Sequence, residues 1–239
     1  MKKLSLIIPC YNPISEQWHE NIVEQYRRFC EAIPEIRVSL VVVNDGATKG
    51  ITNAHFDFFK KQITDIQVVT YSKNRGKGFA LRQGIAKVEA DYYLFTDIDF
   101  PYELESMVAV TRALVKKNGI AAGFRNQNYY KKVPLFRKVL SKAFRAFISL
   151  IGIPVQDTQC GLKGFDNAGK NVFLKTTIDR YLFDFEFLFL AAKQKNIPIY
   201  HVDVKLKDGV VFTTMGLGVL RTETWNLVKV LLVKNGTFQ

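Results

Sequence analysis

The sequence contains no apolar stretch close to the roughly 20 residues that cross a bilayer. The longest candidate, residues 225–233, is short and includes Lys229. The apolar run near the start ends at Pro9, so it predicts a strand rather than a signal peptide. Cysteine is scarce, and its three residues lie far apart and form no metal-binding pattern with histidine. These absences favour a cytoplasmic protein with reduced thiols over a membrane-spanning or disulfide-built one.

Acidic residues are also few, with 22 Asp and Glu against 34 Lys and Arg and a formal net charge of +12. Such a balance is typical of proteins with anionic partners, namely nucleic acid, acidic lipid or phosphorylated substrates. A nucleic-acid-binding module is therefore one hypothesis. Against it, the basic residues are dispersed except in residues 135–151, and no RNA- or DNA-binding motif is present. We expect no nucleic-acid partner.

Apolar runs alternate with helical patterns along the chain, without a repeat of fixed period. This alternation predicts a single α/β domain built on one doubly wound sheet, followed by a C-terminal helical tail. The first helix is expected at about residues 15–32 and the tail helix from residue 218. The strands are expected at residues 4–9, 37–43, 66–70, 119–123, 161–165 and 197–204, with one more that begins at residue 92.

The chain is organised around residues 92–101, where a short apolar run ends in Asp97 and Asp99. The run predicts a buried central strand, and open α/β sheets bind ligands at the carboxyl ends of such strands. Two acids so close together repel each other unless a cation lies beside them. The functional interpretation is a divalent metal that holds a diphosphate. The structural alternative is an Asp-rich turn before the next helix.

Two earlier strands are also followed by polar turns, Tyr11–Asn12 and Asn44–Gly46, and we expect all three turns along one edge of the sheet. A nucleotide fits there, because Asp45 is placed to accept from a base N–H and Lys77 to neutralise phosphate. The loop at residues 73–78 lacks the Gly-Lys-Ser/Thr ending of the phosphate loop of nucleotide triphosphatases. A nucleotidyltransferase is disfavoured because the first loop contains no glycine.

These motifs together resemble the pattern of family 2 inverting glycosyltransferases. The matching stretches are residues 5–12 (SLIIPCYN), 43–48 (VNDGAT), 74–82 (NRGKGFALR) and 95–99 (FTDID). Residues 157–163 (DTQCGLK) and 183–186 (FDFE) are similar to the branch that includes dolichyl-phosphate β-glucosyltransferases and bacterial polyprenyl-phosphate glycosyltransferases. The resemblance implies a glycosyltransferase A type fold with a mixed nucleotide-binding sheet, a UDP- or GDP-sugar donor, and Mg²⁺ or Mn²⁺.

The resemblance also implies roles for single residues. Those expected at the nucleotide-sugar are Pro9, Tyr11, Asn12, Asp45, Asn74, Lys77, Arg82, Asp97 and Gln159. Asp97 and Asp99 match the metal motif, with Asp99 as the direct ligand. The catalytic candidates are Asp157, then Glu186 and Asp184, as a base for a hydroxyl acceptor. Asp184 and Glu186 lie in a very apolar run, so they either face a polar site or pair with Arg180 or a Lys.

Three positions depart from the family pattern. Asn44 stands in place of the usual first Asp of its turn, and Pro13 in place of a common Glu. Pro101 occupies a position where relatives can carry a metal-contacting Gln. The third departure leaves a thinner metal shell, which water or another group would complete.

The acceptor implied by the resemblance is a polyprenyl (undecaprenyl or dolichyl) phosphate at the cytoplasmic face of a membrane, and the alternative is a growing polysaccharide or lipid-linked oligosaccharide. Residues 135–151 predict an amphipathic helix with Lys and Arg opposite Phe and Leu, which suits either an anionic interface or packing on the sheet. Arg125, Arg137 and Lys138 are candidates for contact with a lipid phosphate. We expect a catalytic domain at residues 1–204, whose nucleotide-binding half is 1–100 and acceptor-binding half 101–204. A loop and helix at 205–239 follow.

Overall fold

One mixed sheet forms the centre of the protein. The computed structural model describes residues 1–125, 157–208 and 226–227. Within them the strands are β1 (Lys2–Cys10), β2 (Ile36–Asp45), β3 (Ile66–Tyr71), β4 (Tyr92–Phe95), β5 (Ile120–Arg125), β6 (Lys163–Asp166) and β7 (Ile199–Val204). They lie in the order β3-β2-β1-β4-β6-β5-β7, and β6 runs antiparallel to both neighbours. The doubly wound mixed sheet expected from the sequence is confirmed.

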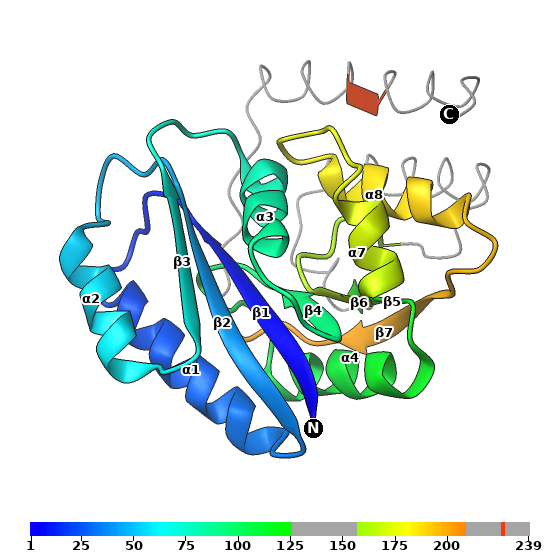
Figure 1. Cartoon of the computed structure of the whole chain (residues 1–239), viewed down its shortest axis with the longest axis horizontal. Helices are drawn as coiled ribbons and strands as arrows, with labels where there is room; N and C mark the ends of the chain where they lie inside the picture. The colour runs from blue at the N-terminus through cyan, green and yellow to red at the C-terminus, as the bar shows by residue number, and fades with distance from the viewer. Residues whose placement is uncertain (126–156, 209–225, 228–239) are drawn as a thin grey trace.

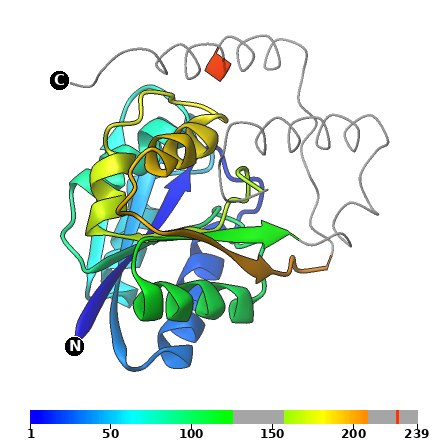
Figure 2. The ribbon, with the colours of Figure 1, turned by 90° about the vertical axis from the view of Figure 1, so that its right-hand side faces the viewer.

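Helices cover both faces of this sheet, which explains why its central strands are continuously apolar. On one face lie α1 (Trp18–Ala32), α2 (Asn53–Gln62) and α4 (Leu104–Lys117). On the other lie α3 (Lys77–Ala86), α7 (Asn167–Phe173) and α8 (Phe183–Ala192). Figure 2 shows α4 and the α7–α8 pair on opposite sides of the sheet. Residues 183–191 of α8 are all buried, which fits a helix that is apolar apart from Asp184 and Glu186.

The strand order gathers the carboxyl ends of three strands. Strands β2, β1 and β4 are parallel neighbours, so their carboxyl ends share one edge, the upper edge in Figure 1. Ligands of open α/β sheets bind outside the carboxyl ends of the strands.

Several element boundaries differ from the sequence prediction. The first helix begins at Trp18 rather than near residue 15. Strand β2 extends through Asp45, so this acid belongs to the strand and not to the following turn. Strand β6 begins at Lys163 instead of residue 161, because residues 157–161 form a separate loop. Element ends depend on the local turn chemistry and are the least certain part of a pattern-based prediction.

The predicted amphipathic helix at 135–151, with Arg137 and Lys138, lies outside the described residues. Most of the predicted C-terminal loop and helix also lies outside them, although Leu227 packs against the apolar cluster on the α3–α7–α8 face. Within the described ranges, no helix has the length and apolar character needed to cross a membrane.

Candidate functional site

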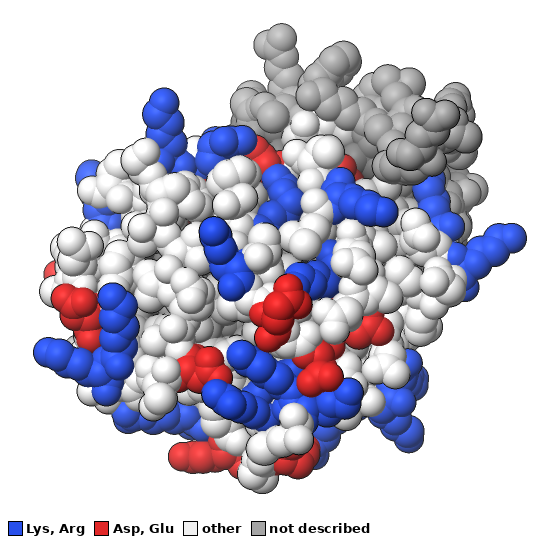
Figure 3. Space-filling view, viewed as in Figure 1, with Lys and Arg blue, Asp and Glu red and all other residues white. Residues whose placement is uncertain are grey.

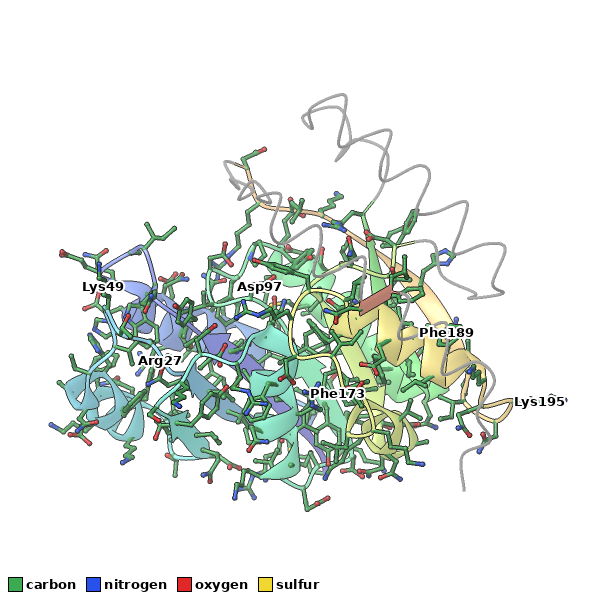
Figure 4. The ribbon with its side chains drawn as sticks, turned by 90° about the horizontal axis from the view of Figure 1, so that it is seen from above. Arg27, Lys49, Asp97, Phe173, Phe189 and Lys195 are labelled. Atoms are coloured by element: carbon green, nitrogen blue, oxygen red, sulfur yellow. The ribbon has the colours of Figure 1, made fainter. Side chains whose placement is uncertain are left out.

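The three predicted polar turns do lie along one edge of the sheet. Cys10 is paired with Asn44, and Ile7 with Phe95, so the turns that follow β1, β2 and β4 are neighbours. Seen from above in Figure 4, Asp97 lies between Lys49, in the loop after β2, and Phe173, at the end of α7. The strand registers therefore place the acidic pair at this edge.

Asp97 is held from two sides. Its Oδ1 atom accepts a 2.6 Å hydrogen bond from Lys77 Nζ. Its Oδ2 atom packs on Gly161, where an added Cβ would lie only 2.4 Å away. Burial alone lowers the pKa of Lys77, but the charges of Asp97 and Asp184 outweigh it and raise the pKa overall. Lys77 is thus a firmly charged ammonium group bound to the first acid of the pair.

Asp99 is the exposed member of the pair. Partial removal from water and then the charge of Asp97 raise its pKa. The turn that presents it is unusual, because Phe100 has a φ of +46° although it is not glycine. The fully buried Phe100 side chain and its N–H bond to the Asp97 carbonyl (3.0 Å) keep this turn in place. A rigid turn therefore offers a free carboxylate to solvent.

Asp45 lies at the same edge but uses its carboxylate within the protein. Its oxygens accept from Tyr71 Oη, Asn74 Nδ2 and the N–H groups of Arg75 and Gly76, all at 2.8 to 2.9 Å. Only 3% of Asp45 is exposed. In this structure Asp45 and Asn74 fix the loop before α3, and base recognition by Asp45 stays a prediction.

The loop after β1 is also fixed by internal contacts. Asn12 has a φ of +40°, and its Oδ1 accepts from the N–H groups of Thr48 and Lys49 at 3.0 and 3.2 Å. Pro9 lies in β1, whereas Tyr11 is 47% exposed at the edge. The structure therefore presents Tyr11 at the carboxyl end of β1 as an accessible side chain and gives Asn12 a role in joining two loops.

Arg82 contacts a loop that the sequence analysis did not single out. Its guanidinium donates to the Ile178 carbonyl at 2.9 Å and to the Asp179 carboxylate. Asp179 also pairs with Arg75 at 3.1 Å, and its carbonyl accepts from the Gly78 N–H at 2.8 Å. Residues 176–179 thus brace the start of α3, and Arg82 is engaged there.

The loop at residues 157–161 joins the end of β5 to the acidic pair. At one end, Asp157 accepts from both Nε and Nη2 of Arg125 at 2.7 Å, and both side chains are largely buried. At the other end, the Gly161 N–H donates to Tyr102 Oη at 2.8 Å. Gln159 is exposed between them. A predicted catalytic acid and a predicted acceptor-binding cation are therefore ion-paired with each other.

Asp184 pairs with a lysine, which is one of the two alternatives expected for it. Lys163 Nζ lies 2.8 Å from its Oδ1 atom, and Lys163 is fully buried. Burial raises the pKa of Asp184, although Lys163 and Lys77 oppose this effect. A buried pair of this kind needs both partners, because either one alone leaves an uncompensated charge.

Glu186 holds the loop at residues 176–179 in place. Its carboxylate accepts from the N–H groups of Thr177 and Ile178 and from Thr177 Oγ1 at 2.8 to 3.0 Å. Only 6% of Glu186 is exposed. Its oxygens are surrounded by donors of its own chain, so the structure does not present them to a substrate hydroxyl.

Comparison with known proteins identifies the family. Residues 5–183 match the sequence model of the family described as glycosyl transferase family 2. The chain belongs to this family. The match includes the turns after β1, β2 and β4, the loop at 157–161 and the first residue of α8.

Curated relatives that match this chain include dolichyl-phosphate beta-glucosyltransferases. The dolichyl-phosphate beta-glucosyltransferase of Drosophila melanogaster is 28% identical over 220 residues, which cover 85% of this chain and 66% of the relative. The human protein of the same name is 29% identical, with coverage of 85% and 67%. The chain thus spans about two thirds of the length of these relatives.

Solved structures share the fold at low sequence identity. Glucosyl-3-phosphoglycerate synthase from Mycobacterium tuberculosis, in complex with Mn²⁺, UDP and phosphoglyceric acid, superposes with a TM-score of 0.63 and 15% identity. It covers 100% of this chain and 80% of that one. A mannosyltransferase from Pyrobaculum calidifontis with GDP-Man and Mn²⁺ gives 0.62 and 14%, covering 100% and 66%. The sheet of this family 2 protein therefore has the glycosyltransferase A type fold.

The acidic pair of this family 2 chain suits a divalent cation only in part. Asp97 and Asp99 supply carboxylate oxygens, which are the donors that Mg²⁺ and Mn²⁺ prefer. Among the described residues, no group of three or more His, Cys, Asp or Glu could hold a metal. Such cations are commonly held by one or two carboxylates, with water and substrate phosphates completing the shell. The residues present fit a cation shared with a phosphorylated ligand.

Several residues that shape this family 2 site were not predicted from the sequence. They are Tyr102, Gly161, Lys163 and Asp179. Their partners are mostly distant along the chain, so no local spacing pattern reveals them. Only Lys163 had a signal, since two acids in an apolar run require a counter-ion.

We expect Glu186→Gln to lower the free energy of unfolding by about 1–3 kcal/mol, because the new amide N–H₂ would face N–H donors of Thr177 or Ile178. Chemical denaturation measures this loss, and amide hydrogen exchange at the two residues should become faster. Glu31→Gln, on the exposed side of α1, is the matched control and should change neither quantity. Unchanged exchange at Thr177 and Ile178 in the Glu186 variant would contradict the bracing role.

Proposed function

We propose that this protein transfers a sugar from a nucleoside diphosphate sugar to a polyprenyl phosphate, with inversion at the anomeric carbon. Membership of glycosyl transferase family 2 supports sugar transfer, and the similarity to dolichyl-phosphate beta-glucosyltransferases supports the acceptor class. A divalent cation on Asp99, with Asp97 beside it, would offset the negative charge that grows on the departing diphosphate.

The donor would lie along the edge where β2, β1 and β4 end. Tyr11 and Gln159 are exposed there, and Lys77 Nζ is within reach of any anion that approaches Asp97. The backbone beneath is rigid, because Asp45 and Asp179 hold the loop before α3 from two sides. Such preorganisation positions a diphosphate without a further ordering cost.

One observation favours a phosphate over a hydroxyl as the acceptor. A hydroxyl must be deprotonated by a general base within hydrogen-bond reach. All three predicted bases are engaged by their own chain: Asp157 by Arg125, Asp184 by Lys163, and Glu186 by the loop at 176–179. A lipid phosphate is already anionic and requires no such base. The site as built therefore suits an anionic acceptor better than a sugar hydroxyl.

One face of the protein shows no charge pattern typical of a nucleic-acid-binding module. On the face drawn in Figure 3, Asp and Glu lie among Lys and Arg in the lower half, and the basic residues form no continuous stripe across it. A nucleic-acid interface usually needs such a stripe to follow the phosphate backbone. The proposal also includes contact of the protein with the cytoplasmic face of a membrane.

Radiolabelled donors test the proposal directly. The protein is incubated with Mn²⁺ or Mg²⁺, a panel of UDP- and GDP-sugars, and undecaprenyl or dolichyl phosphate in detergent, and the product is extracted into organic solvent. We expect label in the organic phase from one donor, dependent on both the lipid and the cation. Label that enters a glycan in the aqueous phase, or no transfer from any donor, would contradict the lipid acceptor.

A further inference from the structure

Lys77 places an ammonium group on the first acid of the metal motif. Among the described residues, it is the basic group within ion-pair distance of Asp97, at 2.6 Å from Oδ1. The other oxygen of Asp97 faces the backbone of Gly161. A divalent ion that approaches Asp97 therefore meets either the Lys77 ammonium group or the backbone of Gly161. A divalent ion and the ammonium group on the same carboxylate oxygen would repel each other strongly, because the distance between them would be short.

The side chain of Lys77 can move while its backbone stays fixed. The N–H groups of Arg75 and Gly76 are bound to Asp45, and that of Gly78 is bound to the Asp179 carbonyl. The Lys77 side chain, in contrast, is 28% exposed. Its ammonium lies 5.8 and 5.9 Å from the ring centres of Phe95 and Phe183, contacts that place no strict limit on direction. Lys77 therefore combines a fixed backbone with a side chain that can change direction.

The charges around the metal motif indicate what would displace the Lys77 side chain. Around the motif lie three carboxylates, Asp97, Asp99 and Asp184, against three ammonium groups, Lys77, Lys163 and Lys207. A divalent cation alone would make the site strongly positive and repel Lys77. A diphosphate that arrives with it restores the balance and offers the ammonium a new partner.

We propose that Lys77 is an internal counter-cation that pairs with Asp97 in the ligand-free protein. When a nucleoside diphosphate binds, the Lys77 ammonium group pairs with its phosphates instead, and Asp97 becomes available to a divalent cation. Metal and nucleotide then bind cooperatively. This inference rests on the proposed donor class, and it adds an ordering that the donor class by itself does not require.

The test measures Mn²⁺ binding by the electron paramagnetic resonance signal of free Mn²⁺, with and without UDP or GDP. In the wild-type protein, one of the nucleotides should tighten Mn²⁺ binding by about tenfold or more, and Mn²⁺ should tighten that nucleotide by the same factor. In Lys77→Met, Mn²⁺ alone should bind about tenfold tighter, and the nucleotide effect should fall to about threefold or less. Lys77→Gln provides a second variant, and thermal melts establish that both are folded.

Lys73→Met is the matched control, because it removes an exposed charge from the same loop and should leave the wild-type cooperativity intact. Full cooperativity in both Lys77 variants would overturn the role of Lys77 while leaving the proposed function in place. Mn²⁺ binding that is equally tight with and without nucleotide in the wild type would also overturn it. Failure of the wild type to bind Mn²⁺, UDP and GDP at all would overturn the inference and the proposed function together.

Discussion

An Asp99→Asn protein should fold like the wild type and transfer sugar on the order of 10³-fold more slowly. The substitution keeps the size of the side chain and removes the one exposed charge of the acidic pair. Without it, the cation that offsets the leaving diphosphate loses its direct ligand. The measurement is kcat/KM with the donor found by the panel, together with Mn²⁺ binding in the presence of nucleotide.

The stability of the Asp99 variant follows from the direction of its pKa. A folded-state pKa above the ordinary value means that the charged carboxylate is less favourable in the folded than in the unfolded protein. At neutral pH the ionised group therefore costs stability, and the cost disappears as the pH falls and the group is protonated. Removing the charge should not lower the thermal midpoint.

Asp57→Asn is the matched control for this loss of activity. Asp57 lies on α2 with an exposed side chain, and its ion pair with Lys60, at 4.0 Å, is long and therefore weak. It should keep wild-type kcat/KM. Wild-type turnover in a purified, folded Asp99→Asn protein would remove the metal hypothesis, and with it the assignment of the acidic pair to the donor site.

The acidic pair could be located from sequence because it depends on one strand and its end. A buried run that stops at two acids fixes both the strand and the position of Asp97 and Asp99 at its carboxyl end. The parallel neighbours β1 and β2 then bring their own turns to the same edge. Each step uses only local periodicity and the rules of open sheets, so the fold and the shared edge could be predicted without coordinates.

The hydrogen-bond and ion-pair partners of each acid were harder to predict from the sequence, because they come from segments far apart in the chain. Asp45 and Glu186 have the composition of ligand-binding acids, yet the structure surrounds both with donors of neighbouring loops. Asp157 and Arg125 were assigned to separate tasks and form one ion pair. A sequence shows that a polar group follows a strand, but the donors that face it depend on loop packing.

Gly161→Ala should reduce kcat/KM by about 10²-fold with little effect on stability, because the new methyl group meets the ends of two side chains, Asp97 and, at 3.3 Å, Lys77. The new Cβ would lie 2.4 Å from Asp97 Oδ2, so one of the two must move. The backbone of residue 161 is tied to Tyr102, whereas the carboxylate is the free end of a side chain. The Asp97 carboxylate is therefore the group that moves. This movement costs little folding energy but changes the position of a metal ligand.

Gly164→Ala tests whether this effect is local. Gly164 lies three positions further along, on β6, and its added Cβ would meet the end of the Leu114 side chain at 3.0 Å. Leu114 can adjust without touching the acidic pair, so kcat/KM should stay within about threefold of the wild type. A Gly161→Ala protein that keeps full activity would show that Asp97 tolerates displacement. The cation would then depend on Asp99 and the donor phosphates alone, and the close packing of the 157–161 loop on Asp97 would have no part in transfer.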